Sequence, residues 1–322
     1  MGLKDFTVVA TGKVRRCAYE KLKETTTFLD WQQGGRMPQD VLEARLAQAD
    51  ALYSTGSLRI TEEVLAKAPK LKIVAQALVG YDNVDLAACA ARGVAVTNTP
   101  GVLVDAVADL AYGLIIDSAR QLVKADAHVK SGLWGMRKPF GLMTDLAGKT
   151  LGIVGMGDIG SAIALRARAS KMKVIYNNRH RRPDDAATGA TYTEFGELLS
   201  RSDFVVLAVT LNASTRKLFN REVIGAMKKG ARLINISRGG VVDTDALCDA
   251  LASGQLAYAA LDVVDPEPLK GDHRLLTLPN ITVTPHMASA TCETRDAMAL
   301  LATDNILAAL SGQPLLTEVK GK

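Results

Sequence analysis

Residues 150–160 read Thr150-Leu-Gly-Ile-Val-Gly155-Met-Gly157-Asp158-Ile-Gly160, an apolar strand pattern that leads into a glycine turn. An alanine-rich helical pattern follows over 162–169, and a second strand pattern covers 174–176. In a strand–turn–helix unit, glycines at these three positions serve the tight turn, the close approach of a pyrophosphate and the packing of helix on strand. The stretch therefore predicts a bound dinucleotide rather than an ordinary turn. Its backbone contacts would come from Gly155, Gly157, Asp158, Ile159 and Gly160, at a helix N-terminus.

The choice between NAD and NADP depends on the residue that follows the second strand. NAD sites carry an acid there, about 20 residues after the glycines, to bind the ribose hydroxyl. This chain has Asn178 followed by Arg179-His180-Arg181-Arg182. An acid would repel a 2′-phosphate, whereas Asn178, Arg179 and Arg182 can hydrogen-bond and neutralise one. A solvated basic loop is the alternative explanation. The position favours NADP, with NADPH preferred over NADH.

Composition sets limits on the class of protein. At 322 residues and 48% hydrophobic content the chain is large for one core, which predicts two domains. A net charge of +5, with basic residues scattered outside 179–182, argues against a nucleic-acid partner. Cys17, Cys89, Cys248 and Cys292 lack metal-site spacing, which fits a reduced cytoplasmic protein without a metal site. No apolar run approaches the roughly 20 residues of a membrane span and no leader pattern opens the chain, so we expect no membrane partner.

Strand and helix patterns alternate along almost the whole chain, which is typical of parallel sheets covered on both faces. Helical patterns are expected at 62–68, 84–91 and 292–310, with one long helix over 102–130 after Pro100. Strand patterns are expected at 7–10, 51–53, 72–76, 94–97, 150–154, 173–176, 204–209, 232–236, 259–261 and 281–284.

The position of the glycine turn, in the middle of the chain, indicates the domain organisation. We predict two Rossmann-like α/β domains with parallel sheets, the nucleotide domain being inserted into a flavodoxin-like substrate domain. Pro100 and Pro285 suggest the boundaries. The predicted substrate-binding domain comprises residues 1–99 and 287–322, and the predicted dinucleotide-binding domain comprises residues 100–286.

Several motifs, in order along nearly the whole chain, resemble those of the D-isomer-specific 2-hydroxyacid dehydrogenases. They are Ala77-Leu-Val79-Gly80-Tyr-Asp-Asn-Val-Asp85, Asn98-Thr-Pro100-Gly101 with Asp105, the glycine turn, Ile234-Asn-Ile-Ser-Arg238-Gly-Gly-Val-Val-Asp243, Ala260-Leu-Asp262-Val-Val-Asp-Pro-Glu267-Pro268 and Thr284-Pro-His286-Met-Ala-Ser289-Ala. Tyr176-Asn-Asn-Arg179 and the ending Pro314-Leu-Leu-Thr-Glu-Val-Lys are most similar to glyoxylate and hydroxypyruvate reductases and the related 2-ketogluconate reductases. The resemblance implies NADPH-dependent reduction of one of these small 2-oxo acids to the D-2-hydroxy acid.

Arg238 is the candidate for substrate binding and polarisation. Reducing a 2-oxo acid requires a cation that holds the carboxylate and polarises the carbonyl. The guanidinium fork binds carboxylate oxygens and stays charged. Arg238 follows an apolar strand and precedes Gly239-Gly240, which places it at the carboxyl end of a sheet, where α/β proteins bind ligands. A surface or ion-paired arginine is the alternative.

His286 is the candidate proton donor, because an imidazole titrates near neutrality and the residue directly follows a strand and Pro285. A structural imidazole is the alternative. A carboxylate bonded to the ring would favour its protonated form and fix its orientation, and Glu267 is the candidate. Between Pro266 and Pro268, Glu267 could equally be a solvated loop acid. Sequence spacing does not show that the two residues meet; the resemblance implies that they do.

Further roles come from the resemblance alone. It implies that the backbone N–H groups of Val79 and Gly80 hold the substrate carboxylate, with Ser289 nearby; without it, Gly80 would be read as a turn residue. Thr210, Ile236 and Asp262 match positions that line the nicotinamide half, where the Asp262 carboxylate accepts from the carboxamide. The long helix after Pro100 and the loop 131–141 resemble a dimerisation arm, which implies a homodimer, although the periodicity equally fits a helix packed on its own core.

Two alternatives from the same family stay open. Transcriptional corepressors of the family bind dinucleotides with similar residues, but no added tail or partner motif is visible here. Formate-type enzymes have glutamine in place of Glu267, and the phosphite type has a lysine that the loop 77–80 lacks. We therefore expect a compact metabolic enzyme.

Overall fold

The structure, a computed structural model, describes residues 2–33 and 37–320, and the chain divides into two compact units. Unit 1 comprises residues 1–103 and 289–322, and unit 2 comprises residues 104–288. The roles and boundaries predicted for two domains stay a prediction.

Unit 1 is built on a five-stranded parallel sheet in the order β2-β1-β3-β4-β5, which is the flavodoxin-like order. The strands are β1 (Thr7–Ala10), β2 (Thr27–Leu29), β3 (Ala51–Ser54), β4 (Ile73–Gln76) and β5 (Ala95–Thr97). The helices are α1 (Arg16–Thr25), α2 (Gln39–Leu46), α3 (Glu62–Ala66), α4 (Leu86–Ala91) and α12 (Cys292–Leu310), with a 3-10 turn η1 (Leu3–Asp5).

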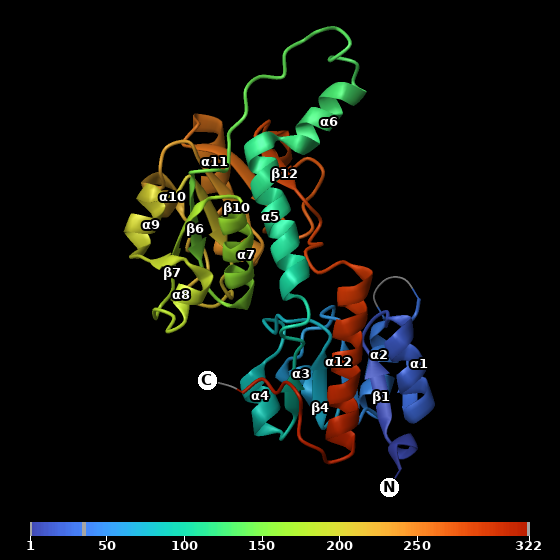
Figure 1. The fold of residues 1–322 in the computed structure, drawn as a ribbon. Coiled ribbons are helices and arrows are strands. Elements are labelled where there is room, and N and C mark those ends of the chain that lie inside the picture. The colour runs from blue at the N-terminus through green and yellow to red at the C-terminus, as the bar shows by residue number, and fades with distance from the viewer. Residues whose placement is uncertain (1, 34–36, 321–322) are drawn as a thin grey trace. The chain divides into compact units, whose positions relative to one another are not determined.

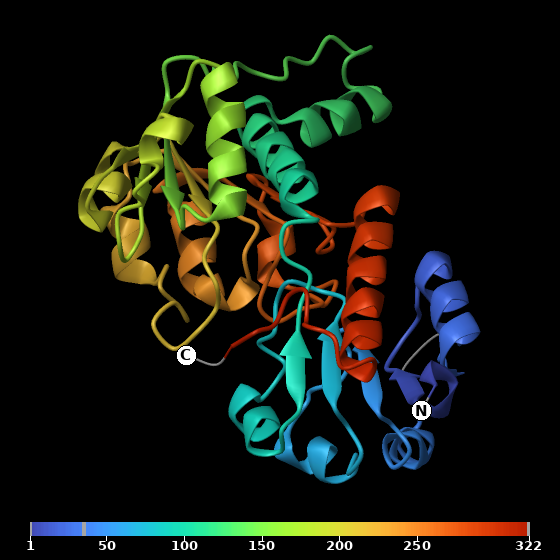
Figure 2. The same cartoon turned by 60° about the horizontal axis from the view of Figure 1, so that its bottom comes forward.

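The core of unit 1 lies on both faces of its sheet. Successive residues of a strand point to opposite faces, so Val8 packs with one cluster and Val9 with another. The Val8 cluster includes Ala302 and Ile306 of α12, and Figure 2 shows this red helix beside the strands of the unit. The C-terminal helix α12 therefore packs in the same core as the N-terminal strand β1.

Unit 2 contains a seven-stranded parallel sheet in the order β12-β11-β10-β9-β6-β7-β8. If β6 is taken as the first strand, the order is that of the Rossmann fold. The chain adds β7 and β8 on one side of β6 and β9 to β12 on the other, so the switch point lies between β6 and β9. The strands are β6 (Thr150–Val154), β7 (Lys173–Asn177), β8 (Thr191–Tyr192), β9 (Phe204–Leu207), β10 (Ala231–Asn235), β11 (Leu256–Leu261) and β12 (Ile281–Val283). The predicted fold class, two α/β domains with parallel sheets, is confirmed.

Helices and 3-10 turns precede or connect the strands of unit 2 (Figure 1). They are α5 (Val104–Arg120), α6 (Leu122–Lys130), α7 (Asp158–Ala169), α8 (Asp185–Thr188), α9 (Phe195–Arg201), α10 (Arg221–Ala226), α11 (Thr244–Ser253), η2 (Gly239–Val241) and η3 (Arg274–Thr277).

The single long helix expected over 102–130 is wrong, because the segment forms two helices that break at Gln121. Gln121 adopts a left-handed backbone with φ of 51°. The Asp117 Oδ1 atom accepts a hydrogen bond from the Val123 backbone N–H at 3.0 Å, so a side chain satisfies a donor of the new helix. Figure 1 shows α6 and the segment after it (green) projecting from the rest of unit 2.

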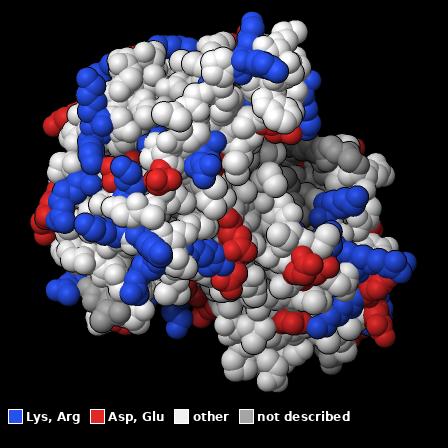
Figure 3. Space-filling model, turned by 45° about the horizontal axis from the view of Figure 1, so that its top comes forward, with Lys and Arg blue, Asp and Glu red and all other residues white. Residues whose placement is uncertain are grey.

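On the face drawn in Figure 3, lysine and arginine side chains lie among acidic and uncharged ones. Over the described residues, no helix combines the length and apolar character needed to span a bilayer. The cytoplasmic location expected from the sequence stays a prediction.

Candidate active site

The candidate residues of unit 2 share one edge of its sheet. Because all the strands are parallel, their carboxyl ends meet at the same edge, where ligands of α/β proteins bind. The structure places Gly155 after β6, Asn178 after β7, Thr210 after β9, Ile236 and Arg238 after β10, Asp262 and Glu267 after β11, and His286 after β12. The sheet topology therefore collects side chains that are far apart in sequence.

The glycine turn after β6 fits a pyrophosphate. Gly155 has a φ of +100°, and a Cβ added there would lie 2.5 Å from the Ala208 carbonyl oxygen. A Cβ at Gly160 would lie 2.4 Å from the Gly155 carbonyl oxygen, whereas one at Gly157 would meet no atom within 4 Å. Gly157 is also the N-cap of α7, and no side chain caps this 12-residue helix. The turn thus leaves open space over a helix N-terminus, which suits a dinucleotide phosphate.

The loop after β7 is tied to that turn through Met156. Asn178 Oδ1 accepts from the Met156 N–H at 2.6 Å, and its Nδ2 donates to the Met156 carbonyl at 3.2 Å. Arg182 Nη1 donates to the same carbonyl at 3.1 Å. Arg179 is exposed, and no described residue forms a hydrogen bond or ion pair with it. The contacts of Asn178, Arg179 and Arg182 with a 2′-phosphate stay a prediction.

Asp184 is a charged neighbour of this loop that the sequence reading missed. Arg182 Nε and Nη2 each donate to one Asp184 carboxylate oxygen, both at 2.8 Å. The Arg182 guanidinium holds the pKa of the Asp184 carboxyl below its ordinary value. The sequence did contain a signal for this ion pair, because Asp184 stands two positions after Arg182, with Pro183 between them.

Asp262 holds the turn that carries His286. Its carboxylate is buried, with 1% of the residue exposed, and it accepts from Thr284 Oγ1 at 2.6 Å. It also accepts from the backbone N–H groups of Met287 and Ala288, both at 2.9 Å. His286 has a left-handed φ of 51°, which these bonds stabilise. The contact predicted between Asp262 and a carboxamide stays a prediction.

The structure brings Glu267 and His286 together. His286 Nδ1 donates to Glu267 Oε1 at 2.7 Å. The two side chains are 45% and 39% exposed, so solvent reaches the pair. Because the carboxylate holds Nδ1, the ring orientation is fixed and Nε2 is the nitrogen that can serve a substrate. This geometry is that of an acid–base pair.

Arg238 is positioned by Asn235, a second residue that the sequence reading missed. Asn235 is buried at the end of β10, and its Oδ1 accepts from the Ser237 N–H at 3.0 Å and from Ser237 Oγ at 2.7 Å. Its Nδ2 donates to the Arg238 carbonyl at 3.0 Å. A Cβ at Gly239 would lie 1.8 Å from the Val264 carbonyl oxygen, so only glycine lets this loop pass the segment that leads to Glu267. The sequence did contain a signal for this role of Asn235, because it is an amide residue at the end of an apolar strand.

The predicted substrate-binding residues Val79, Gly80 and Ser289 belong to unit 1. Val79 and Gly80 follow β4 and are half-buried. Asn98 Nδ2 donates to the Val79 carbonyl at 2.8 Å, which fixes the loop after β4. Ser289 is half-buried as well. The substrate-binding role of Val79, Gly80 and Ser289 stays a prediction.

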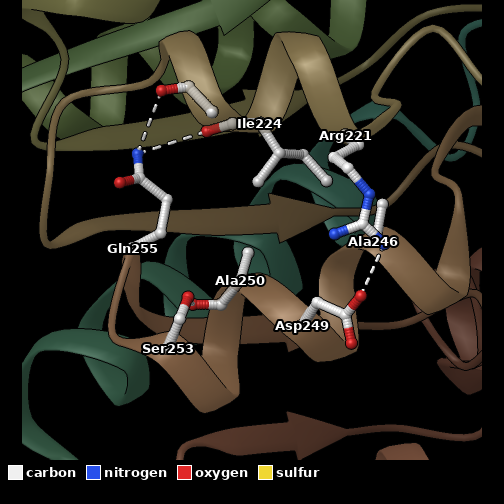
Figure 4. A pocket seen from close by; sticks show the side chains of 8 residues that line it. Arg221, Ile224, Ala246, Asp249, Ala250, Ser253 and Gln255 are labelled. Atoms are coloured by element: carbon white, nitrogen blue, oxygen red, sulfur yellow. Dashed lines mark hydrogen bonds and ion pairs between the residues drawn. The ribbon is translucent and has the colours of Figure 1, made fainter.

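A cavity of about 270 Å³ lies between α10 and α11, and no candidate site residue lines it. Figure 4 shows Arg221 paired with Asp249, and Gln255 directed at backbone carbonyls of the α10 segment. Its polar side chains therefore bond to neighbours. Among the described residues, no three His, Cys, Asp or Glu side chains are grouped to hold a metal ion.

Comparison with known proteins adds independent information. Residues 112–288 match the model of the D-isomer specific 2-hydroxyacid dehydrogenase, NAD binding domain. The glyoxylate reductase of Thermococcus litoralis is 45% identical over 289 residues, 88% of this chain and 87% of that protein. That of Thermococcus kodakarensis is 42% identical over 312 residues, 95% of this chain and 93% of that protein. A solved NADPH-dependent glyoxylate/hydroxypyruvate reductase from Sinorhizobium meliloti, in complex with NADP and malonate, is similar with a TM-score of 0.87 and 34% identity, covering 98% of this chain and 97% of that one.

Proposed function

The chain belongs to the D-isomer-specific 2-hydroxyacid dehydrogenase family and is an NAD(P)-dependent oxidoreductase, and we propose that it uses NADPH to reduce a small 2-oxo acid to the D-2-hydroxy acid. The proposed substrates are glyoxylate, hydroxypyruvate and 2-ketogluconate. The observation that carries the proposal is the 2.7 Å pair of His286 and Glu267 on the same sheet edge as Arg238.

Each of the three residues has a chemical task in this proposal. The Arg238 guanidinium binds a substrate carboxylate oxygen and the carbonyl oxygen, and so stabilises the negative charge that develops on the carbonyl. A bound nicotinamide supplies the hydride that reduces the 2-oxo carbon. His286 gives a proton to the carbonyl oxygen, which becomes the hydroxyl group. Glu267 accepts from Nδ1 throughout and offsets the charge of the imidazolium, which regains its proton from solvent.

The substrate carboxylate is proposed to be held by the backbone N–H groups of Val79 and Gly80, with Ser289 nearby. Support comes from family resemblance and from the Asn98 bond that fixes the Val79 carbonyl. Backbone donors suit a carboxylate because they add no charge of their own and need no side-chain ordering.

For the cofactor, we propose that the glycine turn holds the pyrophosphate, that Thr210, Ile236 and Asp262 line the nicotinamide half, and that the 178–182 loop faces the 2′-phosphate. The absence of an acid at Asn178 and the exposed Arg179 support NADPH over NADH. The relative from Sinorhizobium meliloti, named as NADPH-dependent, offers weaker support.

We also propose a homodimer formed through the arm 122–142. Most of its large apolar side chains are exposed: Leu122 by 55%, Val123 by 61%, Val129 by 50%, Trp134 by 71%, Met136 by 69% and Leu142 by 101%. Leu133 and Phe140 are half-buried. Several exposed apolar side chains on one projecting segment are typical of an interface. Light scattering at several protein concentrations tests this, and a monomeric mass throughout would reject it.

Steady-state kinetics test the function. Glyoxylate, hydroxypyruvate, 2-ketogluconate, pyruvate and phenylpyruvate are each assayed with NADPH and with NADH. We expect the highest kcat/KM for one of the first three acids with NADPH. A preference for NADH would reject the cofactor proposal, and no turnover of any acid would favour a dinucleotide-binding corepressor. Formate and phosphite, with NAD and NADP, complete the panel.

A further inference from the structure

We propose that Asp184 limits how strongly this protein prefers NADPH over NADH, because its carboxylate competes with the 2′-phosphate of the cofactor for Arg182. The inference rests on the proposed NADPH-dependent function. It assigns a specificity-determining role to a residue outside the glycine turn and outside the basic run 179–182.

The first step is the state of the Arg182 guanidinium. Its Nε and Nη2 atoms form the two parallel bonds to Asp184, each 2.8 Å long, and its Nη1 donates to the Met156 carbonyl. The same pair of guanidinium donors, Nε and Nη2, would bind a phosphate in a bidentate manner. Both donors are therefore already filled by an internal anion.

The second step is location. The Arg182 backbone N–H donates to Tyr176 Oη at 3.0 Å, and Tyr176 belongs to β7. The Nη1 bond to Met156 reaches into the glycine turn between Gly155 and Gly157. Arg182 thus lies where β7 ends beside the pyrophosphate turn, which is where the adenosine ribose binds in this fold. An anion bound to Arg182 stands next to any 2′-phosphate there.

The third step is the charge balance. A 2′-phosphate brings negative charge that the 2′-hydroxyl of NADH lacks. To reach Arg182 it must displace the Asp184 carboxylate, and if it does not, it faces that carboxylate across the guanidinium. Either way Asp184 weakens binding of the phosphorylated cofactor and leaves the other unaffected. The Asp184 side chain is 55% exposed, so the pair is a weak one and the exchange is reversible.

The test removes the charge and keeps the shape. In Asp184→Asn, we expect the Kd of NADP⁺, measured by calorimetry, to fall about three- to fivefold, which is the upper part of the range for an exposed ion pair. The Kd of NAD⁺ should change less than about twofold, and the ratio of kcat/KM for NADPH to that for NADH should rise by the same factor as the NADP⁺ affinity. Unchanged or weaker NADP⁺ binding would overturn the proposal.

A matched control is Asp249→Asn. Asp249 is a half-buried carboxylate that is also paired with arginines, Arg221 and Arg274. It lies on α11, which connects β10 and β11 rather than following β7. The control makes the same change in net charge and should leave both dissociation constants unaltered. If it improves NADP⁺ binding as much as Asp184→Asn does, the effect is one of overall charge and the proposal falls.

The double variant tests whether Asp184 acts through Arg182. In an Arg182→Gln background, Asp184→Asn should no longer improve NADP⁺ binding. A full-sized gain in that background would overturn competition for Arg182. A wild-type protein that binds NAD⁺ more tightly than NADP⁺ would reject the proposed cofactor preference instead, because the effect of Asp184 is read from variant and wild type compared with each other.

Discussion

Unit 1 and unit 2 have the same parallel α/β construction, yet the carboxyl edges of their sheets carry different groups. In unit 2 the edge holds ionisable side chains in fixed hydrogen bonds, above all the pair of Glu267 and His286. In unit 1 the edge holds hydroxyls and backbone, such as Thr11 and Thr55, whose Oγ1 atoms lie 3.4 Å apart. The difference indicates that topology selects the edge, whereas the residues placed there determine which chemistry each edge can offer.

The largest expected effect is a loss of turnover when the proposed proton donor in unit 2 is replaced. His286→Gln removes the proposed proton donor, and we expect kcat to fall about 10²- to 10⁴-fold, as for a lost general acid. Dinucleotide affinity should be nearly unchanged, since the glycine turn is intact. His273→Gln, at the N-cap of η3, is the control and should keep normal turnover. A His286→Gln enzyme with a near-normal rate would show that the catalytic acid lies elsewhere.

The variant Arg238→Lys, at the same sheet edge of unit 2, tests whether the charge of the side chain or its planar shape matters for substrate binding. Lysine keeps the positive charge but loses the planar fork, so kcat/KM for the 2-oxo acid should fall about 10- to 100-fold. The control is Arg221→Lys at the paired surface arginine of α10. Should both variants retain full activity, bidentate binding by Arg238 is wrong.

A smaller effect is expected in unit 1. Asn98→Ala removes the 2.8 Å bond to the Val79 carbonyl and loosens the loop proposed to hold the substrate carboxylate. We expect KM for the 2-oxo acid to rise about three- to tenfold with little change in kcat, the cost of one hydrogen bond. Asn220→Ala, at the N-cap of α10, should leave KM alone. A fall in kcat without a change in KM would place chemistry, not recognition, in unit 1.

A final prediction concerns thiol reactivity rather than catalysis, because the two cores should behave alike even though the edges differ. Burial raises the pKa of the Cys89 thiol in unit 1 to about 11, and burial also raises the pKa of Cys248 in unit 2. Alkylation needs the thiolate, so at pH 8 Cys89 should react about 100-fold more slowly than exposed Cys292. Mass spectrometry of the labelled native protein measures this. Rapid labelling of Cys89 alone would indicate an open core in unit 1.

The local parts of the fold could be predicted because they depend on nearby residues. The strand expected over 150–154 has those bounds in the structure, since a short apolar run that ends at a glycine turn favours a buried strand. The predicted helix over 292–310 also has the observed bounds. The continuous helix over 102–130 could not be judged from periodicity, because its break depends on the Asp117 side chain bonding to Val123.

The candidate site also contains residues that could be predicted from the sequence and residues that could not. Arg238 and His286 could be selected from the sequence because each follows a strand in a sheet whose ligand edge is known in advance. That Glu267 meets His286 came from family resemblance, since a loop between two prolines gives no direction in space. Asn235 and Asp184 were missed because each acts through bonds that exist only once its loop has folded.

Met156 joins two parts of the proposed cofactor site, the glycine turn and the loop after β7. Its N–H and carbonyl both bond to Asn178, and the carbonyl also accepts from Arg182. An aspartate at position 178, the simplest change toward NAD, could still accept from the Met156 N–H but could no longer donate to its carbonyl. Reprogramming the cofactor in this scaffold is therefore a task for a linked block, residues 155–157 together with 178–184, and not for a single interchangeable position.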